Sequence, residues 1–143
     1  MKKLLYLFLA ITVACSSGDD DGDKYSIIGE WQLVTTELSQ ENPCFDLTIM
    51  KFFNETDDEL QVGLMNVATG QDLENCFVPE DGETNSIMIR WEETTENNYF
   101  IYTKEWDGVF PFADATLTEN TLQLEVINTT TASNFWEFER LWL

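Results

Sequence analysis

This 143-residue chain contains three cysteines, Cys15, Cys44 and Cys76, and these are the side chains most able to undergo covalent chemistry. The chain contains no histidine, and histidine is the usual general base, the usual activator of a nucleophile and the commonest metal ligand. Hydrolase triads and zinc sites that use histidine are therefore excluded. The cysteines must act by chemistry that needs no imidazole, such as acylation or disulfide formation.

Carboxylates are the other abundant reactive groups, with 27 aspartate and glutamate residues in the chain. The pairs Asp57–Asp58 and Glu92–Glu93 come closest to a pair of catalytic carboxylates. Neighbouring residues on a strand point to opposite faces, so neither pair converges on one point. We therefore expect these acids to be solvated surface groups, and we expect no enzymatic activity.

Cys15 follows a sequence that is typical of a secretory signal peptide. Two lysines precede an apolar run over residues 4–13, which is too short to cross a bilayer because a spanning helix needs roughly 20 residues. Residues 12–15 resemble the bacterial lipobox, in which the cysteine becomes the first mature residue and is acylated on its thiol and its new amine. Thr12 departs from that motif, which usually has leucine there. The alternatives are a secreted protein cut elsewhere and an uncleaved anchor helix.

Residues 16–24 are polar and largely acidic, so they cannot bury apolar surface. We expect a signal peptide over residues 1–14, a disordered tether over residues 15–26 and one folded domain over residues 27–143. An acidic run directly after a lipidated cysteine resembles a surface-export signal of some Gram-negative bacteria, and a solvated spacer is the alternative. The predicted location is the cell envelope, with a lipid anchor in the outer membrane and the domain at the cell surface.

The net charge limits the partners of the domain. The whole chain carries a formal charge of −20, and loss of the two leader lysines leaves five basic residues against 27 acidic ones. Nucleic acid and anionic membrane surfaces would repel such a protein. The expected membrane contact is therefore through the lipid on Cys15 alone, and no cofactor or metal is expected. The acids at residues 19–23 lack the terminal glutamate of a calcium loop.

Acylation of Cys15 would leave Cys44 and Cys76 as an even pair. In an oxidising compartment two remaining cysteines most simply form a disulfide. Closing a loop of this length contributes about 3.5–4 kcal/mol in the chain-entropy treatment. Two free thiols are the alternative.

Short alternating segments with turn signals between them predict an all-β domain, either a sandwich or a barrel. Their order along the chain favours an up-and-down antiparallel barrel of about eight strands. The expected strands cover residues 29–38, 45–53, 59–65, 73–78, 86–92, 99–106, 116–118, 121–127 and 134–143. Residues 54–58 are expected to form a turn, and residues 110–115 are expected to be irregular.

Alternation also predicts which side chains face inward, except in residues 45–53 and 99–106, where the pattern does not decide. The inward sets are Trp31 and Leu33; Leu60, Val62 and Leu64; Ile87, Ile89 and Trp91; Leu122, Leu124 and Val126; and Trp136 and Phe138. Closing the barrel would bring Arg140 near the start of the first strand. Its guanidinium could then lie over the Trp31 indole, a contact worth about 0.5–2 kcal/mol.

The pattern Gly29-x-Trp31 with a late Arg140 resembles the lipocalin (calycin) signature, and residues 27–142 resemble the lipocalin-like domain of bacterial lipoproteins. The other matching positions are Cys44, Phe53, Cys76, Trp91, Leu122 and Leu124. The turn after Phe53 lacks the glycine of that family. The resemblance implies a barrel closed by the pair of Trp31 and Arg140.

Two functions are compatible with such a barrel. It could hold one small apolar ligand, with Trp91, Tyr99, Tyr102 and Trp136 as the candidate pocket lining. It could instead be a structural or protein-interaction subunit of the envelope, with its interior filled by side chains. An eight-stranded barrel is just wide enough for either, so the occupancy of its interior discriminates between them.

Overall fold

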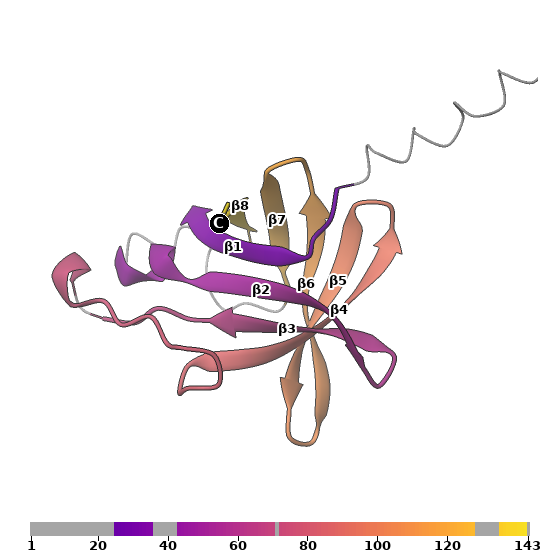
Figure 1. Ribbon diagram of the computed structural model, residues 1–143, viewed down its shortest axis with the longest axis horizontal. Helices are drawn as coiled ribbons and strands as arrows, with labels where there is room; N and C mark the ends of the chain where they lie inside the picture. Colours follow the sequence, from indigo (N-terminus) through magenta and orange to yellow (C-terminus); the bar gives the residue numbers. More distant parts are fainter. Residues whose placement is uncertain (1–24, 36–42, 71, 128–134, 143) are drawn as a thin grey trace, which may run out of the picture.

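Eight antiparallel strands close into a barrel in the order in which they occur along the chain (Figure 1). The computed structural model describes residues 25–35, 43–70, 72–127 and 135–142. The predicted all-β up-and-down barrel is therefore confirmed. The elements are β1 (Gly29–Thr35), η2 (Pro43–Leu47), β2 (Ile49–Asp57), β3 (Leu60–Asn66), η3 (Leu73–Asn75), β4 (Ser86–Thr95), β5 (Asn98–Glu105), β6 (Gly108–Leu117), β7 (Thr121–Val126) and β8 (Phe135–Arg140).

The barrel closes through β1, which pairs with both β2 and β8. Trp31 is opposite Met50 on one side and Arg140 on the other. The β2–β3, β4–β5 and β6–β7 turns lie at the end where β1 begins, which we call the Arg140 end. The opposite end carries η2, the β3–β4 connection and the β5–β6 turn, and we call it the disulfide end (Figure 1).

The core fills the barrel along its length. The inward positions predicted on β1, β4, β7 and β8 are confirmed, except that Ile87 is only partly buried at the edge of the core. The two undecided strands also resolve: β2 turns Met50 and Phe52 inward, and β5 turns Tyr99 and Ile101 inward. Each of these side chains has an exposed fraction of 4% or less.

The orientation of β3 is opposite to the prediction. Gly63 and Met65 face the core, whereas Leu60, Val62 and Leu64 are only half-buried and face outward. The reason lies at Gly63, which is opposite Ile89. A Cβ atom at Gly63 would lie 2.7 Å from Ile89 Cγ1 and 2.6 Å from the Lys51 carbonyl oxygen, so the Ile89 side chain takes the interior space beside β3.

The strand β2 also begins and ends at other residues than predicted. Residues 45–47 belong to η2, and the strand runs on through the expected turn to Asp57. The turn itself is Asp58 and Glu59, both with positive φ angles of 50° and 71°. Polar residues continue the strand because residues 56 and 57 still pair with β3.

Two further segments differ from expectation. Residues 73–78 contain η3 and one isolated bridge, Thr69 with Phe77, rather than a strand. The Asp72 side chain starts η3 by accepting a hydrogen bond from the backbone nitrogen of Glu74. Residues 110–115 lie in strand β6, and the expected irregularity is limited to a shift in the pairing with β5 at Phe112, as in a bulge. Residues 36–38 of the first expected strand lie outside the described residues.

Candidate functional site

The Arg140 end is organised by the side chains of Trp31 and Arg140. The guanidinium carbon of Arg140 lies 4.2 Å from the Trp31 ring centroid. The Trp31 indole is fully buried and donates a hydrogen bond from Nε1 to the Ile27 carbonyl oxygen at 2.8 Å. The resemblance to the lipocalin signature implies this pair, and the geometry is that of a cation–π contact.

Arg140 also fastens the segment that enters β1. It donates hydrogen bonds to the carbonyl oxygens of Ile28, at 3.1 Å, and Ser26. Burial lowers the pKa of Arg140. Gly29 has a φ of +135°, which strains any other residue, and a Cβ there would lie 3.1 Å from an Arg140 nitrogen, so glycine suits this position beside the arginine. This arrangement joins the first and last strands and suits a structural closure.

Two of the four candidate pocket residues, Trp91 and Tyr99, lie inside the barrel near the Arg140 end. Their rings meet edge to face at 5.8 Å, and Trp91 meets Phe52 in the same way at 5.9 Å. Trp91 donates from Nε1 to the Val62 carbonyl oxygen at 3.0 Å. Burial, and then the charge of Glu93, raise the pKa of Tyr99. Both side chains border an open hollow of about 420 Å³.

Trp136 lies inside the barrel towards the disulfide end. Phe45 of η2 and Phe112 of β6 pack edge to face against it, at 5.4 and 5.7 Å. The barrel interior thus holds one aromatic cluster around Trp91 and another around Trp136. The four candidate residues therefore do not line one common pocket.

Tyr102 does not reach the interior, which corrects its assignment to a pocket lining. It is opposite Arg90 on the outer side of the barrel, because Ile101 takes the adjacent inward position of β5. Its hydroxyl donates a hydrogen bond to the Glu92 carboxylate at 2.7 Å. That bond, together with burial and the Glu92 charge, raises the pKa of Tyr102 to about 12.

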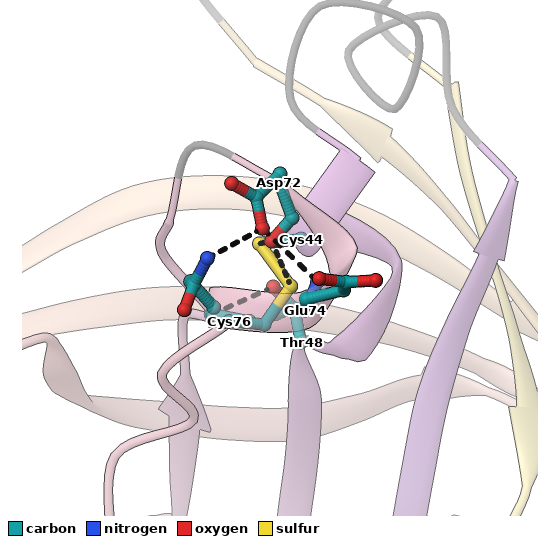
Figure 2. The surroundings of a disulfide bond; sticks show 7 residues. Cys44, Thr48, Asp72, Glu74 and Cys76 are labelled. Atoms are coloured by element: carbon teal, nitrogen blue, oxygen red, sulfur yellow. Dashed lines mark hydrogen bonds between the residues drawn. A yellow bond between two sulfur atoms is a disulfide. The ribbon is translucent and has the colours of Figure 1, made fainter.

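The predicted disulfide between Cys44 and Cys76 is confirmed (Figure 2). It joins η2 to the connection between β3 and β4, with the two Cα atoms 5.4 Å apart. Gly70 lies against it, since a Cβ there would be 2.7 Å from Cys44 Sγ. The bond therefore holds the long β3–β4 connection against η2 at the disulfide end.

Sequence reasoning missed the burial of Arg90. The residue is 7% exposed although it points outward. It donates to the Asp57 carboxylate at 2.6 Å and to the Ile89 carbonyl oxygen at 2.9 Å. The available signal was a cation in the middle of an apolar strand, in a chain with only seven basic residues.

The comparisons with known proteins do not assign a family: no family model, no curated protein and no solved structure matches the chain. Among the residues that the structure describes, no helix is long and apolar enough to cross a membrane. The same part of the chain contains no cluster of three or more histidine, cysteine or acidic side chains suited to a metal ion. Cys15, the signal peptide and residues 15–24 of the tether lie outside the described residues.

Proposed function

We propose that this protein is a lipid-anchored component of the cell envelope whose barrel is a filled scaffold for protein interaction at the cell surface. The observation that supports an interaction role over ligand binding is the packing of the barrel interior by large side chains. The anchor and the location rest on the lipobox-like sequence at Cys15 and the acidic run that follows it. The proposal includes no enzymatic activity and no cofactor beyond the covalent lipid.

Large side chains occupy the space in which a ligand would have to lie. Six inward aromatic residues from five strands have exposed fractions of 8% or less. Buried aliphatic residues from β1, β4, β5 and β7 fill the space between the two aromatic clusters. Three hollows lined by described residues, of about 430, 420 and 220 Å³, are open to solvent. The aromatic residues are Trp31, Phe52, Trp91, Tyr99, Trp136 and Phe138.

Binding of a small apolar ligand is the second candidate. Its support is the 420 Å³ hollow, where Trp91 and Tyr99 meet Tyr25 and Ile28. Ligand sites in proteins are typically concave, mostly apolar and several hundred Å³ in volume. A ligand here would bind at the rim of the Arg140 end rather than within the barrel.

Titration with the fluorescent apolar probe N-phenyl-1-naphthylamine separates the two candidates. We expect no saturable binding to the chain carrying Cys15→Ser, because large buried side chains occupy the interior. Stoichiometric binding by the parent chain would contradict the filled scaffold and support the ligand candidate.

The anchor has its own test. Cys15→Ser should move the protein from the membrane fraction to the soluble fraction, because two or more acyl chains are what hold such a protein on a bilayer. Membrane retention of the variant with normal removal of the signal peptide would contradict the lipid anchor.

A further inference from the structure

The open hollow of about 420 Å³ at the Arg140 end is lined by residues 25–28, Gln61, Trp91, Glu93 and Tyr99. We call it the Glu93 hollow. Gln61 is opposite Trp91 across β3 and β4, and Glu93 is opposite Tyr99 across β4 and β5. Residues directly opposite each other share one face of a sheet. Since Trp91 and Tyr99 belong to the core, an amide and a carboxylate therefore stand at inward positions of the barrel rim.

The floor of the Glu93 hollow is aromatic. The rings of Trp91 and Tyr99 meet at an interplanar angle of 68°, and each side chain is 4% exposed. Tyr25 and Ile28 are more exposed and form the accessible apolar rim. Trp91 also packs against Phe52 of the core. A ligand in this hollow would therefore rest on the filled core rather than enter it.

Glu93 gives the hollow a negative charge. Its carboxylate acts on the Tyr99 hydroxyl, whose pKa is raised first by burial and second by the Glu93 charge. No lysine or arginine is among the described residues that line the hollow. Arg140 donates hydrogen bonds to the carbonyl oxygens of Ser26 and Ile28 but does not itself line it. The hollow should therefore repel an anionic ligand and attract a cationic one.

Gln61 adds a buried acceptor to the same hollow. Its Oε1 atom has no hydrogen-bond partner among the residues that the structure describes. Burial of an acceptor without a donor is unfavourable, and such groups in native proteins call for an explanation. A ligand that brings an N–H donor into the hollow would satisfy this oxygen.

The turns at the Arg140 end extend the negative charge around the hollow. Glu59, Glu96 and Glu119 lie exposed, one in each turn. Residues 57–60 and 95–98 and residues 117–121 include no lysine or arginine. A concave site surrounded by charges of one sign concentrates ligands of the opposite sign, so the location favours cations as the lining does.

We infer that the Glu93 hollow binds an organic ammonium ion that carries an apolar chain. The ammonium would bind the Glu93 carboxylate and donate to Gln61 Oε1, and the apolar chain would cover the rings of Trp91 and Tyr99. Aromatic rings attract ammonium groups through their negatively charged faces. A metal ion suits the hollow less, because hard cations take several oxygen ligands and one carboxylate lines it. The inference goes beyond the proposed function, since the barrel stays filled.

Three ligands with the same carbon chain test the need for a positive charge: hexylammonium, hexanol and hexanoate. Each is titrated at neutral pH into the isotope-labelled full chain carrying Cys15→Ser, and the amide and indole signals are followed by NMR. We expect hexylammonium to bind with a Kd on the order of 1 mM, as fits a ligand with few non-hydrogen atoms, and to shift the signals of Trp91, Glu93 and Tyr99. Hexanol should bind at least about tenfold more weakly, and hexanoate should not bind. Equal binding of hexylammonium and hexanol would overturn the inference.

A matched pair of variants locates the site. Glu93→Gln removes the charge in the hollow and should weaken hexylammonium binding by about tenfold or more. Glu92→Gln makes the same change at the next residue, whose carboxylate bonds Tyr102 on the outer side of the barrel, and should change the affinity by less than about threefold. Both glutamates are exposed, so both variants should fold. Equal weakening by the two variants would mean that only net charge matters, and the inference would fail.

A free amine and the lysine side chain of a partner protein share this chemistry. The lysine analogue Nα-acetyl-lysine methylamide separates them. If it binds and depends on Glu93 as hexylammonium does, the hollow accepts a lysine side chain, and binding of hexylammonium alone assigns the hollow to a free amine. Shifts spread over the acidic surface, with none at Trp91 and Tyr99, would overturn the inference. That result would leave the filled scaffold standing, because the naphthylamine titration tests the interior separately.

Discussion

Strands β3 and β7 belong to the same barrel and show the same alternation of apolar residues, yet they turn opposite sets outward. On β7, Leu122 and Leu124 are buried, and Gln123 is exposed to solvent. On β3, Gly63 faces the core and the apolar residues between the inward positions face outward. Alternation therefore shows that the two sides of a strand differ, but the packing opposite decides which side is inside.

The comparison extends to the two surfaces that these strands help to build. Outward positions on β7 and β8 carry Gln123, Glu125, Glu137 and Glu139; this acidic face suits solubility, because like charges keep molecules apart. The outer side of β3, β4, β5 and β6, the β3–β6 face, instead combines apolar side chains such as Leu64 and Met88 with Arg90, which is 7% exposed and paired with Asp57. The two surfaces therefore differ in how they hold their charges.

Gly63→Ala should give the largest effect, because it attacks the feature that orients β3. The added Cβ would lie 2.6 Å from the Lys51 carbonyl oxygen and 2.7 Å from Ile89 Cγ1. We expect a loss of about 2–4 kcal/mol in the free energy of unfolding, measured by urea denaturation. Gly108→Ala is the control, since its nearest neighbours are 3.9 Å away, and it should change stability by less than about 0.5 kcal/mol. Equal effects of the two changes would contradict the packing at Gly63.

Asp57→Asn should give an intermediate effect on the β3–β6 face. It removes the carboxylate bonded to Arg90, whose side chain is 8% exposed and would keep its charge without a counter-ion. The Asp57 side chain is 49% exposed, so water compensates in part. We expect a loss of about 1–2 kcal/mol in unfolding free energy.

Glu139→Gln on the acidic face is the comparison for that change. It removes one of many like charges from an exposed position and should leave stability within about 0.5 kcal/mol of the parent. A loss as large as that of Asp57→Asn would mean that the two faces do not differ in how they hold their charges.

The smallest effect concerns the titration of Tyr102. The Glu92 hydrogen bond raises its pKa to about 12, so the phenol should ionise well after an ordinary tyrosine when phenolate absorbance is followed against pH. Glu92→Gln should bring the pKa back towards 10.0, the ordinary value.

The same shift fixes the sign of a pH dependence. The unfolded chain loses the Tyr102 proton near pH 10 and the folded chain near pH 12, so the unfolded state binds fewer protons in that window. The stabilisation from the raised pKa is complete below pH 10 and is lost as the pH rises towards 12. Parent and Glu92→Gln titrations that coincide would contradict the bond.

Sequence reasoning predicted those parts of the fold that depend on local alternation and on residue counts. Trp31 and Phe138 were assignable to the interior because each alternates with polar neighbours. Cys44 and Cys76 could be paired because they are the even remainder. Arg140 could be placed near Trp31 because closure of a barrel brings its first and last strands together.

The features that the sequence did not predict depend on contacts between distant segments. The inward face of β3 depends on how Ile89 fills the space beside Gly63. The pattern of apolar residues within β3 does not indicate this packing. The burial of Arg90 depends on the extension of β2 to Asp57, where the composition indicates a turn. The start of η3 depends on hydrogen bonds that the Asp72 carboxylate accepts from Glu74 N and Asn75 Nδ2, in a segment whose pattern predicts a strand.

Methionine oxidation tests the central claim most directly, that the barrel is filled and turns an apolar face outward from β3 to β6. Met88 is 48% exposed, whereas Met65 on β3 is 3% exposed and Met50 is fully buried. With dilute protein in hydrogen peroxide, peptide mass spectrometry should show Met88 oxidised at least about tenfold faster than Met65 and Met50. Oxidation of Met65 at the rate of Met88 would place the other side of β3 in solvent and contradict the account.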